Sequence, residues 1–218
     1  MPDEVIDLDK IPEVVRNKAK QVFDKLKWIS AVKVENDDRE IAYELDGTRT
    51  INGSKDEVTV TITNDGKMVE YDVYVSDPTR RPKVLAAVKV KFPNFELVES
   101  HKYCLGEDIK DKNGGEIFYE LFGKCDKFNV QAQVSKDGKI LEFVYELGLN
   151  KTPKTVSDAL DKAKGGVFKA DTVYVIDKDN KTIGYKFEGK GPLGLSKCFF
   201  VTPDGTRVER VEEIAPKK

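Results

Sequence analysis

The chain has 218 residues, of which 39% are hydrophobic and 35% charged, with a net charge of −2. This length allows one domain or up to three small ones, and the slight negative charge argues against general affinity for nucleic acid or anionic membranes. No apolar stretch approaches the roughly 18 residues of a membrane-spanning helix. The start, Met1-Pro2-Asp3-Glu4, lacks the regions of a signal peptide, so the chain as given is expected to be soluble. A trimmed export signal would leave the same sequence.

Three segments begin with a proline and continue with helical periodicity. The three prolines, which are 70 and 71 residues apart, are Pro12, Pro82 and Pro153. Proline suits a first helical turn because its missing N–H would have no partner there. Apolar residues then recur at helical intervals, as at Val15, Ala19 and Val22. The sequence therefore predicts three helices, of which the third is shorter and breaks at Gly165-Gly166.

Each predicted helix is followed by four stretches of strand character in one order. In the second stretch Ile, Tyr and Leu or Phe occupy every other position, which gives a strand one buried face. The third stretch ends at an Asp-Gly pair, a strong hairpin signal because such turns need positive φ. The predicted strands lie at residues 28–35, 41–45, 58–63 and from 68, then at 97–104, 117–121, 130–135 and from 140, and finally at 168–176, 183–187, 197–202 and from 207.

This recurring order predicts an α+β fold of three tandem units at residues 1–77, 78–148 and 149–218. Each unit is expected to be a helix packed on a four-stranded antiparallel sheet. The helix covers one face of the sheet and leaves the other open to solvent or to a partner.

The run Asp7-Leu8-Asp9-Lys10-Ile11-Pro12-Glu13-Val14-Val15, the Ile-x-Tyr-x-Leu strand and the Asp-Gly-Lys hairpin closing with Glu together resemble PepSY-like domains. These small modules of exported bacterial proteins are similar in plan to the β-lactamase inhibitory proteins. The resemblance covers essentially the whole chain as three copies. It implies a periplasmic or secreted location, and a binding or inhibitory role towards a protein such as a peptidase or other hydrolase. Catalytic residues are not part of the pattern, so the resemblance assigns none.

The residues themselves offer little catalytic chemistry. The only histidine, His101, cannot build the usual zinc site by itself, and no nucleophile, redox or phosphate-binding motif is present. The loop Glu107 to Glu116 has oxygen ligands at irregular intervals, which would suit calcium, but it lacks EF-hand spacing and reads as a solvated turn. We therefore predict a protein that is not an enzyme and has no cofactor and no metal, with His101 as an ordinary strand residue.

Charge is unevenly distributed along the chain. Residues 1–77 carry 11 Lys/Arg and 18 Asp/Glu, a net charge of −7, whereas residues 149–218 carry 14 and 10, a net charge of +4. One interpretation is compositional drift between solvated faces. The other is electrostatic orientation on a partner, or head-to-tail self-association.

Strand alternation also predicts which side chains face away from the helices. On the second and third strands of the later units these include aromatics and glutamines, a composition typical of protein-binding surfaces. The predicted binding residues are Phe118, Glu120, Phe122, Gln131, Gln133, Lys186, Cys198 and Phe200. The alternative for Phe118 and Phe122 is packing against an adjoining unit or a second molecule.

Two functions remain open from the sequence. The first is a non-catalytic protein-binding or inhibitory module of the cell envelope that presents open sheet faces to a partner protein. The second is a structural or assembly protein whose units stack within and between chains, so an oligomer is a possible state. Neither hypothesis involves nucleic acid or membrane insertion, and the sequence does not identify the partner.

Overall fold

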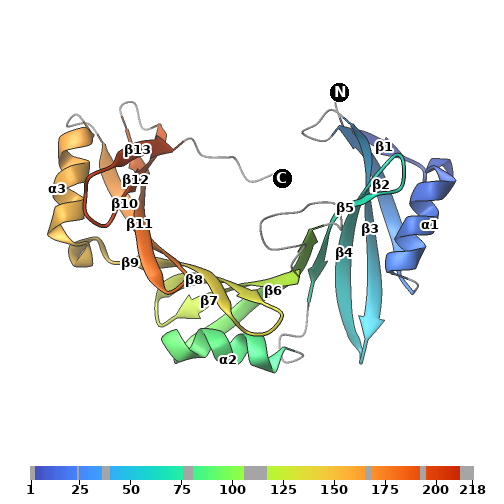
Figure 1. Ribbon diagram of the computed structural model, residues 1–218, viewed down its shortest axis with the longest axis horizontal. Coiled ribbons are helices and arrows are strands. Elements are labelled where there is room, and N and C mark those ends of the chain that lie inside the picture. The colour runs from blue at the N-terminus through green and yellow to red at the C-terminus, as the bar shows by residue number, and fades with distance from the viewer. Residues whose placement is uncertain are drawn as a thin grey trace. The chain divides into compact units, whose positions relative to one another are not determined.

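The computed structural model describes residues 3–23, 25–35, 40–75, 81–105, 117–164, 168–191 and 195–211, coloured along the chain in Figure 1. The helices in these ranges are α1 (Glu13–Val22), α2 (Pro82–Lys91) and α3 (Lys154–Ala163), with 3-10 helices at Leu8–Lys10 and Leu149–Lys151. The strands are β1 (Glu4–Ile6), β2 (Lys27–Glu35), β3 (Ile41–Ile51), β4 (Ser54–Thr63), β5 (Met68–Tyr74), β6 (Phe95–Leu105), β7 (Ile117–Cys125), β8 (Phe128–Ser135), β9 (Ile140–Leu147), β10 (Lys169–Lys178), β11 (Lys181–Lys190), β12 (Ser196–Val201) and β13 (Val208–Val211).

The local elements lie where the sequence predicts them. Each of the twelve predicted strand positions falls in or beside an observed strand, and β1 is an additional one. Pro12 and Pro153 are the N-cap residues of α1 and α3, and Pro82 is the first residue of α2. The glycines of the three Asp-Gly turns have φ between 70° and 88°, a backbone conformation that other residues rarely adopt. The candidate calcium loop and the Gly165-Gly166 break lie outside the described residues.

The predicted fold class, three units each with its own helix on a four-stranded sheet, is wrong. The thirteen strands form one antiparallel sheet in sequence order. β5 pairs with β6 over Glu70 to Tyr74, and β9 pairs with β10 over Glu142 to Leu147, where separate sheets should end. A separate four-stranded sheet would leave its edge N–H and C=O groups unpaired, and pairing with the next strand satisfies them.

The described chain divides into two compact units. Unit 1 comprises Met1–Ala86, Leu97–Leu121 and Val134–Lys139, and unit 2 comprises Ala87–Glu96, Phe122–Gln133 and Ile140–Lys218. The division of the chain at 77/78 and 148/149 stays a prediction.

In unit 1, α1 covers one face of the strands (Figure 1). Val15 and Ala19 of α1 are 0% and 1% exposed and pack in one core with strand residues such as Leu45 and Val60. Because strand side chains alternate between faces, residues 44, 46, 59 and 72 lie on the opposite face.

In unit 2, α3 packs against β12 and β13 in the same manner. Its buried residues Val156 and Leu160 share a core with Val173, Tyr185 and Val201. The residues between these strand positions face away from α3, and they provide a second helix-free surface to compare with that of unit 1.

Candidate functional site

Two rows of side chains cross the strands of unit 1 on the face opposite α1. Strand register aligns the residues within each row, so that neighbours on adjacent strands lie side by side. The first row is Ser30, Asp46, Thr59, Asp72 and Tyr103, and the second is Thr48, Glu57, Tyr74 and His101. We call these two rows, together with Glu99 and Phe118, the His101 face.

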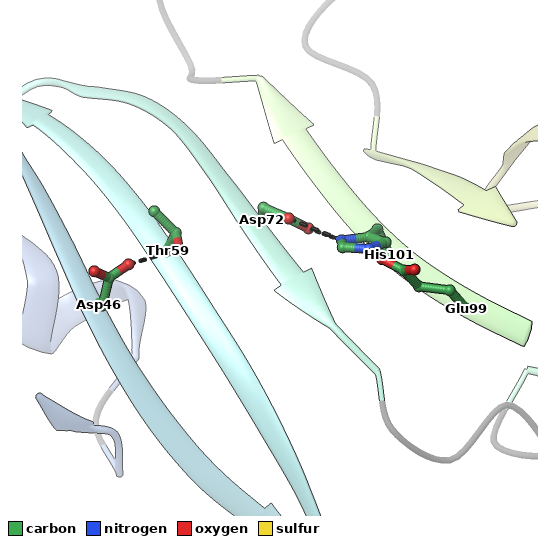
Figure 2. A network of polar contacts seen from close by, with 5 residues as sticks. All are labelled: Asp46, Thr59, Asp72, Glu99 and His101. Carbon is green, nitrogen blue, oxygen red and sulfur yellow. Dashed lines mark hydrogen bonds and ion pairs between the residues drawn. The ribbon is translucent and has the colours of Figure 1, made fainter. Parts of the chain in front are cut away.

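Hydrogen bonds fix the carboxylate of Asp46 in the first row. Ser30 Oγ donates to Asp46 Oδ2 at 2.9 Å. Thr59 Oγ1 donates to Asp46 Oδ1 at 2.8 Å (Figure 2). Each partner stands on an adjacent strand, because antiparallel pairing places Ser30 and Thr59 on either side of Asp46. These two hydrogen bonds therefore fix the orientation of the Asp46 carboxylate on this face.

His101 lies between two carboxylates. Its Nδ1 is 2.8 Å from Asp72 Oδ2, and its Nε2 is 2.5 Å from Glu99 Oε1 (Figure 2). Burial by itself lowers the pKa of His101, but the hydrogen bonds to Asp72 and Glu99 and their charges outweigh it and raise the pKa to about 9. At neutral pH the ring is a cation that donates from both nitrogens.

This arrangement differs from that of a catalytic histidine. General-base catalysis needs one ring nitrogen to accept a proton from a nucleophile, as in the hydrolase triads. Both nitrogens of His101 face carboxylates, and the Thr59 hydroxyl bonds Asp46 instead. The geometry suits a fixed cationic bridge better than proton transfer.

Aromatic rings continue the site along β6 and β7. The ring of Tyr74 meets His101 edge-on at 5.5 Å, and the ring of Tyr103 stacks on the other side at 5.7 Å. Phe118 in turn stacks on Tyr103 at 5.3 Å. Burial, together with the charges of Asp72 and other acids nearby, raises the pKa of the Tyr103 hydroxyl, which stays neutral and able to donate.

A shallow hollow of about 440 Å³ opens beside these rings. The residues that line it are Glu57, Thr59, Asp72, Tyr74, Glu99 and His101. It therefore offers carboxylate acceptors and aromatic surface to an incoming group, and Glu57 and Glu99 on its rim are exposed.

This cluster was not predicted from the sequence, from which His101 was expected to be an ordinary strand residue. Alternation alone places Glu99, His101 and Tyr103 on one face of a strand. The pairing of β5 with β6, which brings Asp72 and Tyr74 beside them, crosses a predicted unit boundary. The signal in the sequence is the alternation of acids and aromatics on β5 and on β6. This alternation predicts a common site only when the two strands are taken to be neighbours.

The predicted binding residues fall on strands of both units. Phe118 and Glu120 lie on the part of β7 in unit 1, and Phe118 joins the His101 face through Tyr103. The others lie in unit 2, and they are Phe122, Gln131, Gln133, Lys186, Cys198 and Phe200. Whether any of the eight binds a partner stays a prediction.

In unit 2, the predicted residues of β11 and β12 meet one another in register. Lys186 lies opposite Phe200 and forms an ion pair of 2.6 Å with Glu188. Cys198 is buried beside them at 1% exposure. The ring of Phe200 lies so close over Gly184 that a Cβ there would come within 2.1 Å of it, which explains why the strand has glycine at this place.

Unit 2 also contains a partly exposed lysine, Lys91, that lies beside three aromatic rings. Lys91 Nζ forms an ion pair with the buried carboxylate of Asp177 on β10. The same ammonium lies 4.6 Å from the ring centroid of Tyr145, 4.9 Å from that of Phe143 and 5.6 Å from that of Phe92. These contacts connect the last residue of α2 with β10, so we assign Lys91 a structural role.

Among the described residues, no group of three or more His, Cys, Asp or Glu is arranged to hold a metal ion. None of the helices within the described ranges is both long enough and apolar enough to cross a membrane.

No protein-family profile matches the sequence. No curated protein matches it either. Solved structures that resemble it include a DUF2874 family protein from Bacteroides uniformis, with 14% identity over 59% of this chain and 88% of that one, at a TM-score of 0.43. A BLIP-like protein from Bacteroides fragilis has 14% identity over 63% and 90%, also at 0.43. A protein from Bacteroides eggerthii, described provisionally as periplasmic, has 14% identity over 61% and 86%, at 0.41. TM-scores this low carry no argument about what the chain does.

Proposed function

We propose that the chain is a non-catalytic protein-binding module that presents the His101 face to a partner protein. One observation carries the proposal. Three rings in contact with His101 or with one another, Tyr74, Tyr103 and Phe118, lie on a sheet face opposite the helix. Tyrosine is enriched at the centres of protein interfaces because it combines a large apolar ring with a polar end.

The hydrogen bonds of the face support the same function. Side chains that are already fixed lose little conformational entropy on association. Asp46 is held by two hydroxyls, and His101 is held by two carboxylates. Such an arrangement resembles a preorganised interface more than a flexible solvated surface.

The sequence resemblance to PepSY-like domains supports a periplasmic or secreted location and an inhibitory role towards a peptidase or other hydrolase. The engagement of both ring nitrogens of His101 supports a role without catalysis.

The test begins with a partner captured from cell-envelope extract, identified by mass spectrometry and then purified. Calorimetry measures its Kd for the wild-type chain and for Tyr74→Ser and Tyr103→Ser. Loss of an aromatic at an interface centre costs about 2 kcal/mol, so each change should raise Kd about 30-fold. Val90→Ser, at a residue 86% exposed on α2, is the control and should leave Kd unchanged. Unchanged affinity in both tyrosine variants would show that the His101 face is not the binding surface.

A further inference from the structure

Positive and negative charges of unit 1 are separated between the two faces of the same strands. On the face opposite α1, alternation and register place seven carboxylates, and they are Glu44, Asp46, Glu57, Glu70, Asp72, Glu99 and Glu120. Among the described residues of β3–β7 that belong to unit 1, alternation places two cations on this face, Lys55, which pairs with Glu57 at 3.6 Å, and His101, which is held by Asp72 and Glu99. Lys124, which has the same alternation on β7, belongs to unit 2. The face therefore keeps an excess of negative charge.

Other basic side chains of unit 1 lie on the helix side. Lys102 Nζ lies 5.1 Å from the ring of Tyr71, which belongs to the unit 1 core, and Arg81 lies 4.2 Å over Tyr119. Burial, then the nearby charges of Arg81 and Arg49, lower the pKa of Lys102. These cations are on the wrong side of the sheet to neutralise the acids.

The acidic surface is broad. Its carboxylates stand on five consecutive strands, β3 to β7, and strands lie about 4.8 Å apart, so they span roughly 19 Å. A single metal ion or a small amine would meet only one or two of them. A protein surface or an extended chain segment is long enough to contact carboxylates across the whole of this span.

We propose that the partner docks on the His101 face through a basic segment whose Lys and Arg side chains meet these carboxylates. Ammonium or guanidinium groups enter the hollow near Glu57, Asp72 and Glu99, and their stems lie on the rings of Tyr74 and Tyr103. The charge of −7 on residues 1–77 also accelerates the approach of a basic partner. This inference rests on the proposed function and specifies the chemistry of its partner.

The probe is a capped ten-residue peptide of alternating Lys and Thr, with a Glu-Thr peptide of the same length as comparison. Titration followed by backbone amide chemical shifts should show the Lys-Thr peptide binding at β4 to β6. Its Kd should rise several-fold between 50 and 300 mM NaCl, because salt screens exposed charges. The Glu-Thr peptide should not bind.

Two double variants distinguish the effect of carboxylates on this face from the effect of the net charge of the chain. Glu57→Gln with Glu70→Gln removes two exposed carboxylates from the sheet face opposite α1. This double substitution should raise the Kd for the Lys-Thr peptide about fivefold. Glu13→Gln with Glu96→Gln removes the same charge at exposed residues that do not belong to the face, and should change Kd less than about twofold. Circular dichroism confirms that all four substitutions leave the fold intact.

Four outcomes would overturn the inference. The first is equal Kd in the two variant pairs, and the second is binding of the Glu-Thr peptide at similar affinity. The third is a dimer of the chain alone, seen by sedimentation and disrupted by Glu57→Gln with Glu70→Gln, since a second copy would then occupy the face. A purified partner that requires Tyr103 but ignores salt and the charge variants would also overturn this inference, while leaving the proposed function in place.

Discussion

Each unit has a row of side chains that crosses the strands on the sheet face opposite its helix. The two rows differ in which side chains contact their charged groups. The row of unit 1 is Ser30, Asp46, Thr59, Asp72 and Tyr103. The row of unit 2 is Glu146, Tyr174, Lys186, Phe200 and Glu209. In unit 2, burial lowers the pKa of Lys186, but its contact with Glu188 outweighs this and raises it, so a local ion pair meets the charge. The carboxylates of the unit 1 row are met instead by the hydroxyls of Ser30 and Thr59 and by His101.

The cores of the two units differ in a similar respect. Each contains a buried aspartate paired with a basic side chain, Asp56 with Arg49 at 3.3 Å in unit 1 and Asp177 with Lys91 in unit 2. Within the part of the chain that the structure describes, the buried Oδ1 of Asp177 has no hydrogen-bond partner. Asp56 has other interactions besides Arg49. The pair in unit 2 therefore depends more heavily on Lys91, with the Tyr145 hydroxyl as a further contact of Asp177.

The largest effect should come from breaking that pair. Lys91→Met leaves Asp177 as a buried charge without its cation, and loss of one partner of a buried pair costs about 3 kcal/mol. Arg49→Met should cost less, because Asp56 retains other contacts when Arg49 is removed. Urea denaturation of the two variants measures the difference. The double variant Lys91→Met with Asp177→Asn should recover part of the loss, and equal losses in the two single variants would contradict the comparison.

The next effect is a pH dependence that belongs to unit 1. The pKa of His101 is raised from 6.5 to about 9 in the folded chain, so its contribution is complete below about pH 6.5 and is lost as pH rises through 9. Since the site is partly exposed, we expect about 1–2 kcal/mol rather than the full value of the shift. Urea denaturation at pH 6 and at pH 10 measures it. His101→Gln is the control for other titrating groups, and a wild-type stability loss no larger than that of His101→Gln would contradict the prediction.

The smallest expected effects are the stability losses caused by single substitutions in each of the two rows. Thr59→Ala removes the hydroxyl that donates to Asp46 and should cost about 1 kcal/mol. Lys186→Met breaks the more exposed pair with Glu188 and should cost about 0.5 kcal/mol. Thermal unfolding of both variants tests the order. A larger loss for Lys186→Met would mean that the ion pair of unit 2, rather than the hydrogen-bonded row of unit 1, fixes its face more firmly.

The local elements could be predicted from the sequence because their causes are local. Alternation at Ile41, Tyr43 and Leu45 specifies a strand with one buried face, and the structure buries Tyr43 and Leu45 at 7% and 2% exposure. The Asp-Gly pairs specify turns, and Gly66 adopts the positive φ that they require. The excess of acid in residues 1–77 is likewise a property of the sequence alone, but the sequence does not say on which face these acids lie.

Only the tertiary structure decided which strands pair across the predicted boundaries. Any strand edge carries the same row of N–H and C=O groups, so the pattern of a strand does not name its neighbour. The pairing of β5 with β6 turned the expected separate sheets into one and placed His101 opposite Tyr74 and within reach of Asp72. The positions of the strands could thus be predicted from local sequence patterns. The candidate site depends on the long-range pairing of β5 with β6, which no local pattern predicts.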